Sequence, residues 1–72
     1  MNFKKELIKV VKGYTVEGAL LNIDLLLEVY NKKLISFYTN KDRLVINLND
    51  GVIIGYKEGN TIDCITYIKG GY

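Results

Sequence analysis

The side chains in this sequence that could carry chemistry are scattered carboxylates and a single cysteine. Asp24, Glu28 and Asp63 alternate with apolar residues, as solvent-facing strand positions do, and most of the other acids fall in segments typical of turns. General acid–base catalysis needs a positioned pair of titratable groups, and no histidine or nucleophile motif accompanies these acids. We therefore expect no catalytic residues and no enzyme activity.

The same residue types argue against a bound cofactor or metal. Cys64 has no second cysteine to pair with, the chain has no histidine for zinc, and its isoleucine neighbours favour a small buried apolar role. Gly51, Gly55 and Gly59 have the spacing of hairpins, and no lysine–serine pair or following helix makes them a phosphate loop. We expect no metal and no cofactor.

The elements that must position these residues are organised around the stretch 43–56. It predicts two strands folded back at Asn49-Asp50-Gly51, because Asp-Gly between β-branched runs favours a tight turn with positive φ. Strands are predicted over approximately 34–39, 43–48, 52–56 and 61–68, separated by short polar turns.

The N-terminal third is less uniform. Residues 2–12 predict an amphipathic helix capped by Asn2 and ended by Gly13. The segment after it supports two interpretations: its alternation favours a strand over approximately 19–30, and a helix capped by Thr15 remains the alternative.

Together these elements predict a single domain, 1–72, of the α+β class. A short N-terminal helix would pack on a five-stranded antiparallel β-meander, either an open sheet or a small curled barrel. Five strands make a sheet about 24 Å across, whereas one short helix is about 10 Å wide. The helix cannot cover even one face, and several strands are apolar on both sides. Either the sheet curls into a barrel that hides one face, or a second copy or another protein covers it, and in both cases we expect part of the second face to be a binding surface.

Tyrosines and nearby cations are the candidates for that contact. In one register three tyrosines lie opposite the core set, although β-propensity alone also explains them. The candidate partner-binding residues are Tyr30, Tyr38, Tyr67, Lys32, Lys33, Lys41 and Arg43. A surface of this kind could also stack bases and hold phosphates, but the single arginine and the net charge of +2 favour a protein partner over nucleic acid.

Nothing in the chain predicts a membrane protein. Residues 1–12 have no secretory signal pattern, and the apolar segment 20–30 is too short and too interrupted to span a bilayer. The unpaired cysteine fits a reducing compartment, so we expect a cytoplasmic location.

Part of the chain resembles the Sm-like RNA-binding proteins. A short helix followed by five strands is their arrangement, and Gly18-Ala19-Leu20 with Asp24 is similar to their first motif. The resemblance implies a small barrel that binds oligonucleotides. Glu28 stands where that family has a base-contacting asparagine, so no functional residue is carried over.

Short chains without motifs and with an apolar sheet surface are frequent among regulatory and inhibitory proteins. We therefore expect a small non-enzymatic binding protein that acts through protein contacts or as a homo-oligomer, such as a phage or mobile-element inhibitor of a bacterial defence system. The alternative is an Sm-like or SH3-like oligonucleotide-binding module with a lysine and tyrosine surface.

Overall fold

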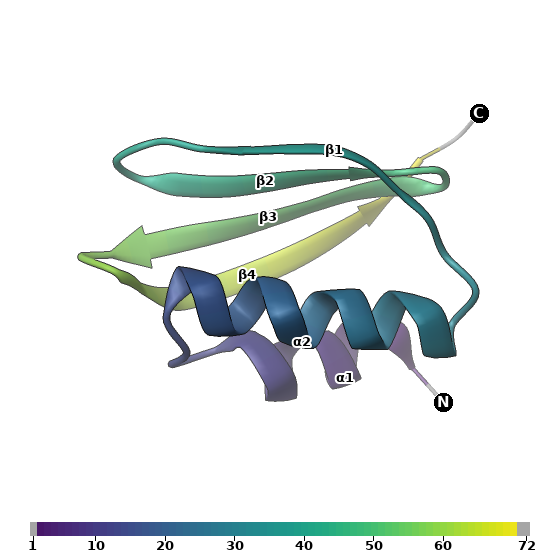
Figure 1. Ribbon diagram of the computed structural model, residues 1–72, viewed down its shortest axis with the longest axis horizontal. Helices are drawn as coiled ribbons and strands as arrows, with labels where there is room; N and C mark the ends of the chain where they lie inside the picture. The colour runs from purple at the N-terminus through teal and green to yellow at the C-terminus, as the bar shows by residue number, and fades with distance from the viewer. Residues whose placement is uncertain (1, 71–72) are drawn as a thin grey trace.

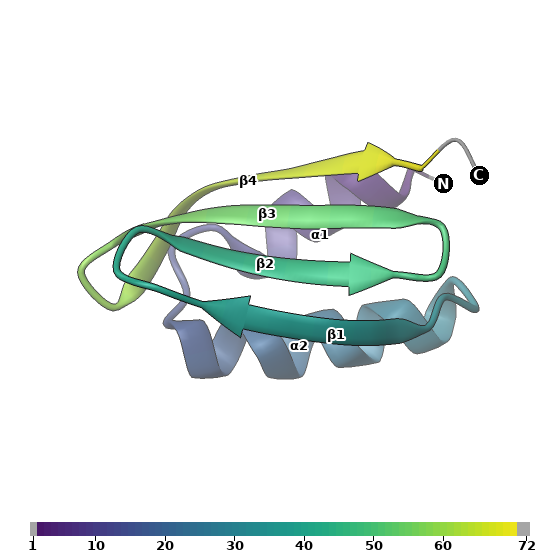
Figure 2. The same cartoon turned by 90° about the horizontal axis from the view of Figure 1, so that it is seen from above.

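The computed structural model of the chain describes residues 2–70 and shows a helix layer packed on an antiparallel sheet (Figure 1). The elements are α1 (Phe3–Val11), α2 (Val16–Val29), β1 (Leu34–Thr39), β2 (Arg43–Leu48), β3 (Gly51–Glu58) and β4 (Thr61–Lys69). The four strands form a meander in the order β1-β2-β3-β4, and both helices lie on the same side of it (Figure 2). The predicted α+β class with an N-terminal helix is confirmed.

The prediction of five strands is wrong, because the segment predicted as a strand over 19–30 lies in helix α2. The hydroxyl oxygen of Thr15 accepts the N–H of Gly18 at 3.2 Å, which satisfies an amide at the start of the helix. The buried residues of α2 are Val16, Ala19, Ile23 and Leu27. The burial of this helical stripe stabilises the helix more than the alternation of apolar residues would stabilise a strand. The four remaining strands form an open sheet rather than a barrel.

Helix α1 forms where the sequence predicts it. The side chain of Asn2 accepts the N–H of Lys5 at 3.3 Å, and the buried stripe consists of Phe3, Leu7 and Val11. Gly13 follows with a φ of 85°, the left-handed conformation expected of a glycine just beyond a helix.

The β2–β3 hairpin turns at Asn49-Asp50, as predicted, but in a different conformation. Neither of these residues nor Gly51 has a positive φ, so the expectation of a left-handed turn is wrong. Glycine is needed at position 51 for another reason, since an added Cβ would lie 2.4 Å from the main-chain oxygen of Ile68 in β4. The close approach of β3 to β4 therefore depends on the missing side chain.

An extra residue in β4 decides which of its side chains face the helices. The register between β3 and β4 shifts so that Asp63 has no partner in β3. Because of this bulge, Ile62 and Ile65 are both buried although they are three positions apart. Cys64 is consequently exposed on the other side of the sheet, and the expectation of a buried cysteine is wrong.

The core lies between the helices and the middle of the sheet. Its largest fully buried side chains are Leu7, Val11 and Ile23 from the helices and Leu44, Ile46, Ile53 and Ile62 from β2, β3 and β4. Strand β1 contributes no buried residue, because the helices lie closer to β4 than to β1 (Figure 1). Two helices, rather than the one predicted, cover one face of the sheet, and the described chain places no layer on the other face.

Two glycines of β3 provide a matched test of the close approach between β3 and β4. Gly51→Ala is expected to lower the free energy of unfolding by about 1–3 kcal/mol, because the new methyl group must push against backbone. Gly55→Ala is the control: its Cβ would meet the Ile62 side chain at an ordinary 3.5 Å, so its effect should stay within about 1 kcal/mol. Chemical denaturation measures both, and equal effects would contradict this packing.

Candidate functional site

Alternation along the four strands sends one set of side chains away from the helices, and we call this surface the open face. In the sheet register, Tyr38 lies opposite Val45, Val45 opposite Ile54, and Ile54 opposite Thr66. The open face consists of Ser36, Tyr38, Arg43, Val45, Asn47, Val52, Ile54, Tyr56, Glu58, Thr61, Cys64, Thr66 and Ile68.

The open face is apolar at its centre, and its two charged side chains, Arg43 and Glu58, lie toward one end. Val45 is only 9% exposed, whereas Tyr38, Tyr56 and Ile68 around it are 55%, 40% and 52% exposed. The guanidinium carbon of Arg43 lies 5.5 Å from the centre of the Tyr56 ring, within the range of a cation–π contact. A surface with an apolar centre and charged groups only at one end is chemically suited to apolar and aromatic contacts.

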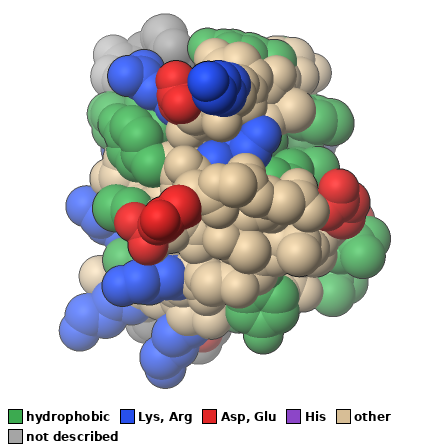
Figure 3. Space-filling model, turned by 90° about the vertical axis from the view of Figure 1, so that its left-hand side faces the viewer, with side chains coloured by type: hydrophobic (Ala, Val, Ile, Leu, Met, Phe, Trp, Pro, Cys, Tyr) green, Lys and Arg blue, Asp and Glu red, His purple; other side chains and the backbone are tan. Residues whose placement is uncertain are grey.

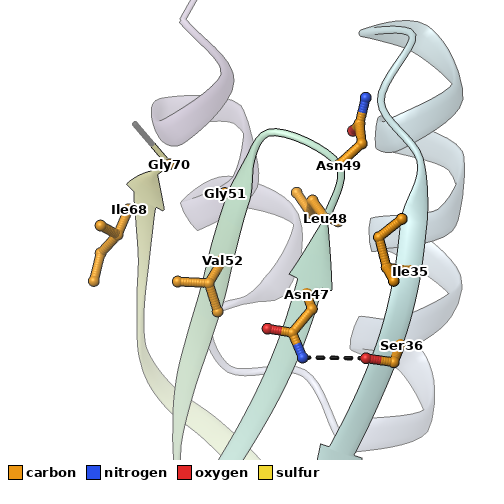
Figure 4. A pocket seen from close by; sticks show the side chains of 9 residues that line it. All are labelled: Ile35, Ser36, Asn47, Leu48, Asn49, Gly51, Val52, Ile68 and Gly70. Atoms are coloured by element: carbon orange, nitrogen blue, oxygen red, sulfur yellow. Dashed lines mark hydrogen bonds between the residues drawn. The ribbon is translucent and has the colours of Figure 1, made fainter. Parts of the chain in front are cut away.

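A hollow lies on the open face near the β2–β3 turn (Figure 4). Its walls include Ile35 and Ser36 of β1, Asn47 of β2, Val52 of β3 and Ile68 of β4. The Asn47 side-chain amide donates a hydrogen bond to the Ser36 hydroxyl at 3.2 Å, which leaves the rest of the wall largely aliphatic. No titratable side chain lines the hollow, so it is suited to bind an apolar group.

The end of the molecule that carries the β1–β2 and β3–β4 turns has a different character. Figure 3 shows scattered basic and acidic groups on this end, with apolar side chains mainly toward the margins of the view. The charged groups at this end are of both signs and form no continuous basic surface in this view.

The structure separates the tyrosines that were predicted to share one face. Tyr38 lies on the open face, but Tyr30 ends helix α2 and Tyr67 pairs with Ile53 on the helix-facing side. Both Tyr30 and Tyr67 pack against the core. The prediction that the three tyrosines share one face is therefore wrong for Tyr30 and Tyr67. The segment before Tyr30 is a helix rather than a strand, and the Tyr67 side chain points to the opposite side of the sheet from Tyr38.

The four candidate cations are also divided. Arg43 lies on the open face, and Lys41 lies in the exposed turn between β1 and β2. The Lys33 side chain is exposed, and its main chain exchanges two 3.0 Å hydrogen bonds with Asn49 in the β2–β3 turn. Lys32 belongs to a partly buried cluster on the helix side.

In this cluster the Lys32 ammonium forms an ion pair and hydrogen bond with Asp50 and lies 3.4 Å from the Tyr67 hydroxyl. The ring centres of Phe3 and Tyr67 lie 5.0 Å and 5.3 Å from the ammonium nitrogen. Phe3 also meets Tyr30 edge to face, with the ring centres 5.2 Å apart. The cluster joins α1, the segment after α2, the β2–β3 turn and β4, so we interpret it as a structural lock.

The lock shifts the pKa values of both charged partners. The hydrogen bond from Lys32 lowers the pKa of the Asp50 carboxyl, and the same bond raises the pKa of the Lys32 ammonium, while desolvation opposes each shift. Because the folded-state pKa of Asp50 is depressed, the pair stabilises the fold above the ordinary value of 3.8 and loses this effect as the pH falls through the folded value. The Lys32 contribution is present below its ordinary pKa of 10.5 and is lost at higher pH.

Sequence reasoning missed Tyr56 and Ile68 on the open face. Alternation over 52–56 already places Val52, Ile54 and Tyr56 on one side, so this signal was present in the sequence. The position of Ile68 could not be read from the sequence. Strict alternation from the buried Ile62 would place Ile68 on the helix side, but the bulge at Asp63 shifts the alternation by one residue and places it on the open face.

Replacing Asp50 with asparagine tests the lock. Asp50→Asn is expected to lower the free energy of unfolding by about 1–2 kcal/mol at pH 7, because the ion pair is lost. The difference from the wild type should shrink as the pH falls from 5 to 2, where the wild-type carboxylate is itself protonated. Asp42→Asn, in an exposed turn, is the control, and a pH-independent difference for Asp50→Asn would contradict the assignment.

Within residues 2–70, no three side chains of the metal-binding types gather closely enough to hold an ion, and no helix is long and apolar enough to cross a bilayer. Comparison of the chain with protein-family models, with curated proteins and with solved structures gives no match. The surfaces of the chain itself are therefore the basis for a functional proposal.

Proposed function

We propose that this chain is a small non-enzymatic binding protein that acts through protein–protein contacts at its open face. The observation that carries the proposal is an apolar sheet face that no other part of the described chain covers. Tyr38, Tyr56 and Ile68 stand exposed on it around the nearly buried Val45.

The residue types on the open face fit a protein partner. Sheet faces of this apolar character are normally packed against another layer, and exposed apolar patches mark sites of association. Tyrosine and arginine are enriched at the centres of protein interfaces, and the Arg43–Tyr56 pair presents both. A chain that acts by covering a partner's surface would serve as a regulator or inhibitor of that partner.

An oligonucleotide-binding role is the second candidate, because two exposed tyrosines and Arg43 share the open face. Base stacking on such rings is possible, but tight binding also requires several cations along the phosphate path. Arg43 is the only cation among the open-face residues, so we favour the protein partner.

Charge substitution on the open face tests the proposal. In affinity capture from the source cells, the wild-type chain is expected to retain a defined protein at moderate salt, and Ile68→Asp should reduce that retention at least about tenfold, because the partner must bury a carboxylate. Phe37→Asp, at an exposed position on the helix-facing side of β1, is the matched control and should retain the partner.

Equal retention by the wild type and Ile68→Asp, or the absence of a retained protein, would contradict the proposal. Binding of the purified chain to single-stranded RNA or DNA, with an affinity that falls steeply with salt, would favour the second candidate instead.

A further inference from the structure

The outer side of helix α2 carries an apolar stripe that the core does not use. Leu21, Leu25 and Val29 are 70%, 64% and 67% exposed, and their spacing of four residues aligns them along the helix. We call these three residues the helix stripe. A helix that is apolar on both its inner and its outer side is normally buried on both.

An apolar groove runs beside the helix stripe, between α1 and α2. Val10 and Tyr14 line it on one side, and Leu25, Leu26 and Val29 line it on the other. The Asn22 side-chain amide donates a 2.6 Å hydrogen bond to the Val10 carbonyl, which holds the two helices together at this point. The helix layer therefore presents a ridge and a groove side by side, a shape that a second copy can complement.

Charges of opposite sign flank the helix stripe. Helical periodicity relative to the buried Leu7 and Ile23 places two exposed lysines on the outer side of α1 and three exposed acids beyond the stripe on α2, and a third exposed lysine follows at the C-cap of α1. These residues are Lys5, Lys9 and Lys12, and Glu17, Asp24 and Glu28. Among the described residues the only ion pair within 4 Å is Lys32–Asp50, so all six flanking charges are free to meet a partner.

Two of these charges are placed against the dipole of their own helix. Lys5 lies in the first turn of α1, and Glu28 lies in the last turn of α2, which has no basic residue there. Each sits where the helix dipole disfavours its sign. Lys9 in the last turn of α1 and Glu17 in the first turn of α2 have the favoured sign, so the helix dipoles explain only part of the pattern.

We propose that the helix stripe is the interface of a symmetric dimer of this chain. A two-fold axis that runs parallel to α2, between the helix stripe and the groove, seats the stripe of each copy in the groove of its partner and sets the lysines of each copy over the acids of its partner. The surface is thus complementary to itself in both shape and charge. This dimer does not depend on the function proposed above, because the open face lies on the other side of the molecule.

The size of the helix layer limits the strength of the dimer. The whole molecule extends 32 × 22 × 16 Å between Cα atoms, and α2 with its 14 residues is only about 21 Å long, so the interface area lies at the low end of stable interfaces. We therefore expect a dimer that dissociates on dilution.

Sedimentation equilibrium of the full chain from micromolar to millimolar concentration tests the dimer. The mass should rise from 8.2 kDa to twice that value, and Leu25→Lys should weaken dimerisation at least about tenfold. Ile68→Lys is the matched control, because it places the same charge at a similarly exposed position on the open face. A wild-type mass of 8.2 kDa throughout, or disruption by Ile68→Lys and not by Leu25→Lys, would overturn the proposal.

Charge reversal gives a second, independent readout. A variant with Lys5, Lys9 and Lys12 all changed to Glu should be monomeric, as should one with Glu17, Asp24 and Glu28 all changed to Lys. An equimolar mixture should restore a dimer, because each acidic surface then meets a basic one. Circular dichroism confirms that each variant is folded, and failure of the mixture to pair would overturn the role of these charges.

Discussion

The packing of two helices against a single face of the sheet is the constraint on which the other features depend. A two-layer fold buries the inner side of each layer and leaves both outer sides in solvent. In this chain both outer sides are apolar, with Val52, Ile54 and Ile68 on the sheet and Leu21, Leu25 and Val29 on α2. The core itself is complete without these residues, so their apolar character points to contacts with other molecules.

The β2–β3 turn is the point at which this packing is fastened. Lys33 and Gly70 hydrogen-bond to it from the main chain on either side, and the Lys32–Asp50 ion pair ties it to the end of α2. The missing side chain of Gly51 lets β4 approach at the same place. One end of the sheet is thus locked to the helix layer, whereas β1 lies away from it with all its residues exposed.

The sequence was sufficient to predict the strands but not the layer that covers them. The bounds of β1 and β2 were predicted correctly, because short β-branched runs between polar turns leave few alternatives. Helix α2 was missed because its outer stripe is apolar: with leucines on both sides of the helix, the segment has the alternation of a strand as well as a helical period. The feature that concealed the helix is therefore the same one that suggests an interface.

The positions of the candidate residues were predicted in part for a related reason. Tyr38 lies opposite the core, as simple alternation in a regular strand predicts, and Arg43, predicted to lie near the tyrosines, is on the same face. The prediction for Tyr30 failed because the segment before it is a helix rather than a strand. The prediction for Cys64 failed because the bulge at Asp63 turns its side chain to the open face. A bulge depends on the pairing of two strands, so the sequence of one strand does not reveal it.

The reactivity of the single cysteine tests most directly whether the open face of the sheet is exposed to solvent. Cys64 lies on that face and is exposed, so its thiol should react with an aromatic disulfide reagent in the folded chain about as readily as after denaturation. The rate should be unchanged at protein concentrations that favour the dimer, because the helix stripe lies on the other side. A thiol that reacts only after denaturation would contradict the account.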